Sequence, residues 1–202
     1  MAGGRRIAGV DEAGRGPWAG PVVAAAVILR RNALPGTVRI DDSKRLSPSQ
    51  RLTAYHAIVR HADVSVGIVP ADIIDERNIR QATLHAMREA VERLTAPPDL
   101  VLVDGNDPPS LSVPCRTIVH GDRLSYPIAC ASIIAKVTRD ALMAFYHRLF
   151  PAYRFDRHKG YGTAEHLDVL RRLGPSLLHR MSFEPIRAVA DAASPTHVPP
   201  IT

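Results

Sequence analysis

Short apolar runs alternate with amphipathic stretches along most of the chain. Five runs have the length and composition of strands, and they occupy residues 6–10, 21–29, 64–69, 100–103 and 116–120. Apolar positions spaced three or four residues apart predict four helices, over residues 48–59, 79–94, 127–150 and 163–173. This alternation is typical of an α/β protein.

Local signals refine this pattern at several boundaries. Ser47-Pro48-Ser49-Gln50 combines an N-cap, a proline at the first helical position and a glutamine at the third. The first two strands are joined by too few residues for a crossover helix, so they are predicted to be antiparallel neighbours. We expect a mixed central sheet with helices on both faces. Residues 1–190 are predicted to form a single domain with a helical C-terminal part over about 150–190, and residues 191–202 a loose tail.

Length and composition exclude several classes of protein. The chain has 202 residues, 46% of them hydrophobic and 23% charged, which suits one globular domain. The longest apolar run, Val22 to Leu29, is too short to cross a membrane, and the N-terminus lacks a secretory signal. Cys115 and Cys130 have no metal-ligand spacing. A cytoplasmic protein is expected, with a monomer as the default state.

The formal net charge of +6 is a moderate sign of a polyanionic partner. The basic residues are strongly biased toward arginine, with 23 arginines beside Lys44, Lys136 and Lys159. A lysine retained against such a bias points to a position that needs a compact ammonium group.

Acidic residues follow three of the predicted strands. Asp11 and Glu12 come after the first strand, Asp104 after the fourth and Asp122 shortly after the fifth. A carboxylate at a strand end is common on any surface. Three such sites together favour a functional cluster, because ligands gather at the carboxyl ends of strands in α/β sheets.

Four carboxylates meeting at one point would repel each other unless cations lay between them. All-oxygen ligation favours two Mg²⁺ or Mn²⁺ ions, a pair suited to phosphodiester hydrolysis. One geometric condition applies to Asp11 and Glu12. Neighbouring residues on a regular strand point to opposite faces, so both can face one site only if the strand bends or ends there.

Glycine-rich segments supply further candidates. Gly14-Arg15-Gly16 lacks the spacing of a dinucleotide-binding loop, and a strand follows it, so we interpret it as a loop that approaches a sugar or phosphate closely. Ser43 and Lys44 could bind phosphate, or they could belong to a plain polar loop. Tyr161 lies between two glycines, which leaves its ring open for stacking; a buried tyrosine is the equal alternative. Lys136 and Arg139 indicate a solvated face of the long helix.

Six motifs occur in the order found in one known family. They are Gly9-Val10-Asp11-Glu12-Ala13-Gly14-Arg15-Gly16-Pro17, Asp42-Ser43-Lys44, Val103-Asp104-Gly105-Asn106, Gly121-Asp122, Ala131-Ser132-Ile133-Ile134-Ala135-Lys136-Val137-Thr138-Arg139-Asp140 and His158-Lys159-Gly160-Tyr161-Gly162-Thr163. The chain closely resembles bacterial ribonuclease HII over about residues 5–188.

The resemblance implies a ribonuclease H-like fold and an endoribonuclease that hydrolyses the RNA strand of RNA–DNA hybrids. It also implies incision on the 5′ side of single ribonucleotides in duplex DNA, by a two-metal-ion mechanism that leaves 3′-hydroxyl and 5′-phosphate ends. Carried over by position, the metal-binding catalytic residues are Asp11, Glu12, Asp104 and Asp122. The implied substrate contacts are Gly14, Arg15, Gly16, Ser43, Lys44 and Tyr161.

Two alternatives remain open at this level. Four acids alone also suit a metal-dependent DNA nuclease or resolvase on the same fold. A non-catalytic hybrid-binding module is a third interpretation, although such a module would be expected to lack one of the acids.

Overall fold

Five strands form one mixed sheet in the computed structural model of the chain, which describes residues 5–30 and 34–193. The strands are β1 (Ile7–Ala13), β2 (Val22–Leu29), β3 (Ala62–Val69), β4 (Leu100–Asp104) and β5 (Cys115–Ile118). Their order across the sheet is β3-β2-β1-β4-β5. β1 pairs antiparallel with β2, as predicted from the short connection, and parallel with β4.

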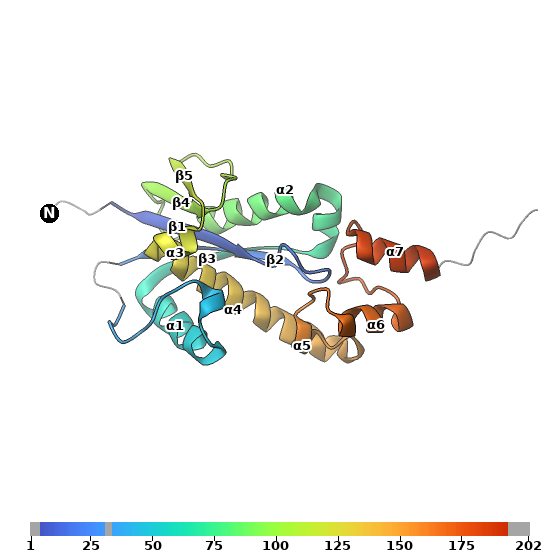
Figure 1. Cartoon of the computed structure of the whole chain (residues 1–202). Coiled ribbons are helices and arrows are strands. Elements are labelled where there is room, and N and C mark those ends of the chain that lie inside the picture. Colours follow the sequence, from blue (N-terminus) through green and yellow to red (C-terminus); the bar gives the residue numbers. More distant parts are fainter. Residues whose placement is uncertain (1–4, 31–33, 194–202) are drawn as a thin grey trace, which may run out of the picture.

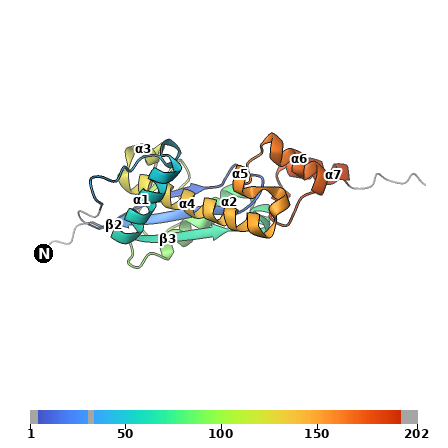
Figure 2. The ribbon, with the colours of Figure 1, turned by 90° about the horizontal axis from the view of Figure 1, so that it is seen from below.

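Helices cover both faces of this sheet (Figure 1). They are α1 (Pro48–His61), α2 (Ala71–Glu92), α3 (Gly121–Leu124), α4 (Tyr126–Leu149), α5 (Phe155–His158), α6 (Ala164–Leu173) and α7 (Glu184–Ala193), with short 3-10 turns at Ser43–Arg45 and Pro151–Tyr153. Helix α2 packs on one face, while α1 and α4 pack on the other (Figure 2). The α/β class with helices on both faces is confirmed.

The apolar core is divided between the two faces by the alternation of the strands. Val22, Ala24 and Ala26 of β2 pack toward α2, and Ala25 and Val27 pack toward α1 and α4. A strand that is buried on both faces needs a continuous apolar run, which explains the sequence Val-Val-Ala-Ala-Ala-Val-Ile-Leu of β2. Small alanines there allow the helices to pack closely against the sheet.

Local sequence chemistry set some boundaries as predicted and missed others. The capping box at Ser47 is present, with Ser47 Oγ accepting from Gln50 and Gln50 Oε1 accepting from Ser47. Helix α2 is divided at Asn78, which has a φ of 66° and whose Oδ1 accepts a hydrogen bond from the amide of Gln81. The helix predicted from residue 79 therefore begins where expected, and the helical segment from Ala71 to the kink was not predicted.

The C-terminal helical segment lies beyond one end of the sheet (Figures 1 and 2). Ala19, Met143 and Phe155 form a small core there, separate from the two cores on the sheet faces. The tail predicted over residues 191–202 lies mostly outside the described residues. None of the described helices is long and apolar enough to cross a membrane.

Candidate active site

Two neighbouring acids of β1 lie on opposite faces of the sheet. Asp11 shares the face of Gly9, which packs against the start of α4, and Ser132 of α4 lies beside its carboxylate and favours its charged form. Glu12 shares the face of Val10 and lines a small cavity with residues of α2. The prediction that the first strand ends at these acids is wrong, because β1 continues regularly through Ala13.

Asp104 brings the two faces together. It is the last residue of β4, and the register that pairs Val10 with Val103 places it beside Asp11. Its Oδ1 accepts a hydrogen bond of 2.6 Å from the amide of Gly121, the residue before Asp122 in α3. Since β4 ends here, the sheet no longer separates the two faces, and the charge of Asp104 acts on Asp11 and Glu12 alike.

We call Asp11, Glu12, Asp104 and Asp122 the acidic cluster. Burial raises the pKa of Asp11 well above its ordinary value, and repulsion from Glu12 and Asp104 raises it further. Burial also raises the pKa of Glu12, against the opposing attraction of Arg15, whose guanidinium lies 3.7 Å from the carboxylate. The pKa of Asp122 is raised by burial and by repulsion from Asp42 and Asp104.

The side chains of the acidic cluster are neighbours without forming a closed cage. Among residues 5–30 and 34–193, no three His, Cys, Asp or Glu side chains are grouped so that they could hold a metal ion as they stand. The donor chemistry nevertheless fits a hard divalent cation, because every candidate ligand is a carboxylate oxygen. The raised pKa values of Asp11 and Glu12 come first from burial and then from repulsion by neighbouring carboxylates, so both causes disfavour the charged forms without a cation.

A cavity of about 30 Å³ lies at the Glu12 side of the acidic cluster. Glu12, Asp104 and Arg15 contribute to its lining, together with residues of α2 and of the segment after β4. Arg80 of α2 is paired there with Asp107 through hydrogen bonds of 2.9 and 2.7 Å.

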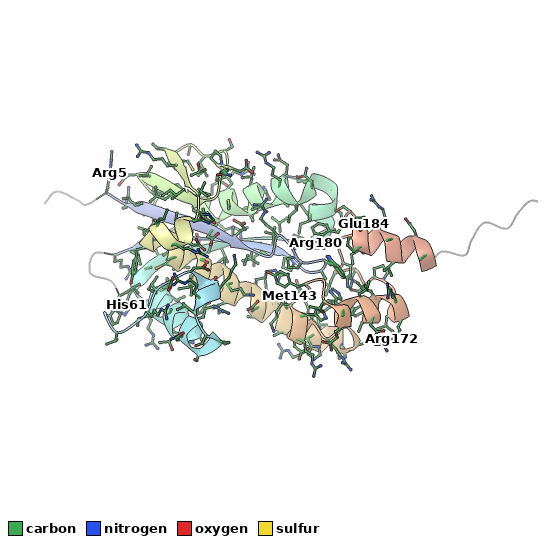
Figure 3. The ribbon with its side chains drawn as sticks, viewed as in Figure 1. Arg5, His61, Met143, Arg172, Arg180 and Glu184 are labelled. Carbon is green, nitrogen blue, oxygen red and sulfur yellow. The ribbon has the colours of Figure 1, made fainter. Side chains whose placement is uncertain are left out.

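The loop between β1 and β2, residues 14–21, is held from behind by two buried arginines. Arg180 donates to the carbonyls of Gly14, Arg15 and Gly20 at 2.6–3.0 Å. Arg139 of α4 donates to the carbonyls of Ala19 and Pro21 at 3.0 Å. Arg180 lies where the sheet meets the C-terminal helices (Figure 3). We call residues 14–21 the glycine loop.

This arrangement determines which way the glycine loop presents its peptide groups. In a trans peptide the C=O and the following N–H point in opposite directions. Because the carbonyls of Gly14 and Arg15 point inward to Arg180, the amides of Arg15 and Gly16 point away from it, at exposed positions. Gly14 has a φ of 97°, and a Cβ there would lie 2.0 Å from Arg139 Nε, so the close approach of that arginine requires glycine.

Tyr161 lies beside the glycine loop with its ring partly exposed. A Cβ on Gly16 would be 3.9 Å from the ring. Lys136 Nζ lies 6.0 Å and Arg139 Cζ 5.9 Å from the ring centroid. The side chain is 43% exposed, so the buried alternative does not apply. Gly162 allows Trp18 to pack under this segment, since a Cβ there would lie 2.2 Å from the indole.

Three buried histidines support the backbone of Tyr161. His166 Nδ1 faces the carbonyl of Tyr161 at 3.0 Å and must donate to it, which leaves Nε2 to accept from His179 Nε2 at 3.0 Å. His179 Nδ1 then accepts from the amide of Ser176. His158 stacks on His166 with centroids 4.2 Å apart. Each ring is neutral with one fixed tautomer. We call His158, His166 and His179 the histidine relay.

Burial disfavours the charged form of all three rings. It lowers the pKa of His166 to about 4 and the pKa of His179 to about 3, with repulsion from neighbouring histidines adding to the effect. The pKa of His158 is lowered for the same reason, against a hydrogen bond to the carbonyl of Tyr153.

Ser43 and Lys44 flank the acidic cluster in different ways. Ser43 is buried, and its Oγ accepts a hydrogen bond of 2.9 Å from Ser132, the residue that contacts Asp11. Lys44 is exposed, and its charge acts on Glu12 and Asp122. A phosphate contact by Ser43 or Lys44 stays a prediction.

Some residues of the site were not identified as candidates from sequence. Ser132 and Asp42 both act on the acidic cluster, and their signal was their presence in the quoted motifs. The predicted solvated helix face is wrong for Arg139, which is 1% exposed. Arg180 carried no signal, because its partners lie about 160 residues away along the chain.

Comparisons with known proteins show the family of the chain. The sequence pattern of the family described as Ribonuclease HII matches residues 8–186. Ribonuclease HII of Geobacter sulfurreducens is 56% identical over 187 residues, covering 92% of this chain and 85% of its own length.

Two solved structures have a similar fold. Ribonuclease H2 from Pyrococcus horikoshii OT3 superposes with a TM-score of 0.78 at 24% identity, covering 93% of this chain and 98% of its own. Bst-RNase HIII in complex with Mn²⁺ superposes with a TM-score of 0.70 at 18% identity, covering 96% and 72%. The ribonuclease H-like fold expected from the motifs is therefore confirmed, and the chain belongs to the ribonuclease HII family.

Proposed function

We propose that this chain hydrolyses the RNA strand of RNA–DNA hybrids and incises duplex DNA on the 5′ side of a single ribonucleotide, leaving 3′-hydroxyl and 5′-phosphate ends. Membership of a nuclease family supports the hydrolysis. One observation supports the choice of ribonucleotides. The amides of Arg15 and Gly16 face away from Arg180, in the loop that follows β1 and whose Arg15 side chain lies 3.7 Å from Glu12.

The acidic cluster is proposed to hold the divalent ions. Its four carboxylates provide oxygen ligands whose mutual repulsion a cation would relieve. When bound, such ions activate a water molecule and stabilise the leaving 3′ oxygen. Ser132 and the Gly121 amide orient the carboxylates of Asp11 and Asp104 from outside the cluster. The Mn²⁺ complex of the structurally similar Bst-RNase HIII supports Mn²⁺ or Mg²⁺ here.

The glycine loop and Tyr161 are proposed to recognise the ribonucleotide. The 2′-hydroxyl is the group that distinguishes RNA from DNA, and backbone amides can donate to its oxygen. The exposed ring of Tyr161 stacks on the sugar that follows the ribonucleotide. Lys44 and the exposed arginines would hold the duplex backbone, which makes binding salt-dependent. We further propose a cytoplasmic monomer with one catalytic domain over residues 1–190.

A matched pair of substrates tests the proposed function. We expect metal-dependent incision of a duplex with one embedded ribonucleotide and little cutting of its all-DNA twin, mapped by the ends produced. Equal cutting of the two duplexes would favour the DNA nuclease or resolvase. Binding of the hybrid without any cutting would favour the non-catalytic module.

Asp104→Asn tests the role of the acidic cluster in the same assay. Loss of the charge that links both faces of the sheet should lower turnover by at least about a hundredfold, the usual scale for transition-state electrostatics. Asp168→Asn removes an equal charge from an exposed position on α6 and should keep wild-type turnover. Full activity in Asp104→Asn would disprove the assignment.

A further inference from the structure

A basic groove lies next to the acidic cluster, on the far side of α2 from the sheet core. Its volume is about 460 Å³, and it is lined by residues of α2 and of the segment that connects β4 to β5. Arg77, His85 and Arg88 provide its cationic and imidazole groups, and Gln81 and Ser110 provide neutral hydrogen-bonding groups. The described residues that line this groove include no carboxylate.

The two arginines of the groove have hydrogen-bonding capacity to spare. Arg88 Nη2 is already hydrogen-bonded with His85 Nδ1 at 3.1 Å, and its buried Nε has no hydrogen-bond partner among the described residues and lies 3.9 Å from Glu92, so Nη1 is the group of Arg88 left for an anion. Arg77 Nε is likewise 3.9 Å from Glu76. By contrast, Arg80 between them is fully engaged in two short bonds to Asp107. The groove therefore presents two guanidinium groups that an anion can still bind.

The groove adjoins the small cavity at the site of the proposed chemistry. Leu84 lines both the groove and the small cavity that Glu12 and Asp104 share. A strand whose scissile linkage lies at the acidic cluster would therefore reach the groove with its neighbouring phosphates. The small cavity has three carboxylates beside two arginines, whereas the lining of the groove has guanidinium groups and no carboxylate, so the groove is the better match for a phosphate without a metal ion.

We propose that the groove formed by Arg77, Gln81, His85, Arg88 and Ser110 binds the phosphate backbone of the duplex to one side of the scissile linkage. This inference rests on the proposed function, since it takes its occupant from the neighbouring site. The contact is to phosphate, so it extends the binding surface without reading sequence or sugar.

Salt-dependent binding tests the proposal. Fluorescence anisotropy would measure the affinity of the full chain, without divalent metal, for a long labelled all-DNA duplex over a range of KCl concentrations. In the double variant Arg77→Ala/Arg88→Ala the slope of log K against log salt should fall by about 1.8, because each neutralised phosphate contributes about 0.9. Affinity near 0.1 M salt should fall at least about tenfold. Shortening the duplex from one side only should abolish the difference from wild type.

Two matched variants complete this experiment. Arg30→Ala/Arg60→Ala removes the same charge at the opposite end of the sheet and should leave the slope unchanged. The variant Arg77→Lys/Arg88→Lys keeps both charges and should retain most of the wild-type slope. An unchanged slope in the groove variant, as expected if the groove instead binds an acidic protein, would overturn the proposal, and so would an equal fall in the control. Because binding is measured on DNA without cleavage, failure of the proposed function would appear separately, in the ribonucleotide assay.

Discussion

The acidic cluster and the arginine–histidine junction behind the glycine loop both bury ionisable groups, with opposite outcomes. In the junction, Arg139 and Arg180 direct seven hydrogen bonds to backbone carbonyls, and each ring of the histidine relay has a donor and an acceptor role assigned. In the acidic cluster, burial and repulsion raise the pKa of Asp11, Glu12 and Asp122.

The difference shows how the two regions divide the work of the site. A satisfied network is rigid, so the junction can hold the glycine loop and Tyr161 in one position. A cluster of repelling carboxylates is instead poised to gain free energy from cations. The comparison therefore predicts that mutations in the junction destabilise the fold, while neutralising a member of the cluster stabilises it.

The largest effect is expected at Arg180. Arg180→Met leaves the buried carbonyls of Gly14, Arg15 and Gly20 without a donor, so the free energy of unfolding should fall by about 3 kcal/mol. Urea denaturation measures the loss. The exposed Arg172 of α6 provides a control (Figure 3), and Arg172→Met should change stability by less than about 0.5 kcal/mol.

The same variants sharpen the functional side of the comparison. Arg180→Lys keeps the charge, but its compact ammonium lacks the planar fork with which the guanidinium spans the three carbonyls. Where it folds, its preference for a ribonucleotide duplex over DNA should weaken more than its metal-dependent turnover. Equal losses in both would mean that Arg180 does not position the glycine loop.

The second prediction concerns the histidine relay, which should make the stability of the fold depend on pH. The histidine relay has lowered pKa values, so the unfolded chain binds protons below pH 6.5 while the folded chain excludes them until about pH 4 for His166 and about 3 for His179. Stability is therefore fully present above about pH 6.5 and lost as pH falls toward 4, by on the order of 2 kcal/mol for each of these rings.

Chemical denaturation at several pH values measures this loss. His179→Gln should flatten the pH dependence, because the variant has one fewer group that the folded state keeps unprotonated. His56→Gln, at an exposed position on α1, should retain the full wild-type dependence. A relay that tolerates protonation would show identical curves for the two variants.

The limits of sequence analysis follow the same division. The capping box at Ser47 and the apolar run of β2 depend on neighbouring residues, and both were predicted from sequence. The helix start at residue 79, directly after the kink at Asn78, was also predicted, but the helical segment from Ala71 to the kink was missed.

The acids and the buried basic groups differed in how far sequence could identify them. Asp11, Glu12, Asp104 and Asp122 stood out because acidic residues near strand ends share a simple physical meaning. Arg139 and Arg180 did not, because a buried arginine is recognisable only by carbonyls brought to it from more than a hundred residues away. Asp11 and Glu12 lie on opposite faces because β1 continues as a regular strand to Ala13. The sequence analysis ended this strand three residues earlier, at residue 10, and so did not predict the arrangement.

The smallest expected effect, and the one that decides the comparison, is at Asp11. Asp11→Asn removes a buried charge that two neighbouring carboxylates repel, while its size and its contact with Ser132 can be kept. In metal-free buffer at neutral pH the variant should therefore be more stable than wild type, by about 1 kcal/mol. Asp168→Asn, which breaks an exposed ion pair with Arg172, should be neutral or slightly less stable.

Thermal unfolding with and without Mn²⁺ separates the two possible origins of such a gain. If repulsion within the acidic cluster is its cause, Mn²⁺ should raise the Tm of wild type more than that of Asp11→Asn, since an ion that binds only the folded state stabilises it in proportion to its affinity. A metal-free Asp11→Asn protein less stable than wild type would mean that the cluster, like the junction, is already satisfied by its surroundings. Its carboxylates would then have no electrostatic reason to take up cations.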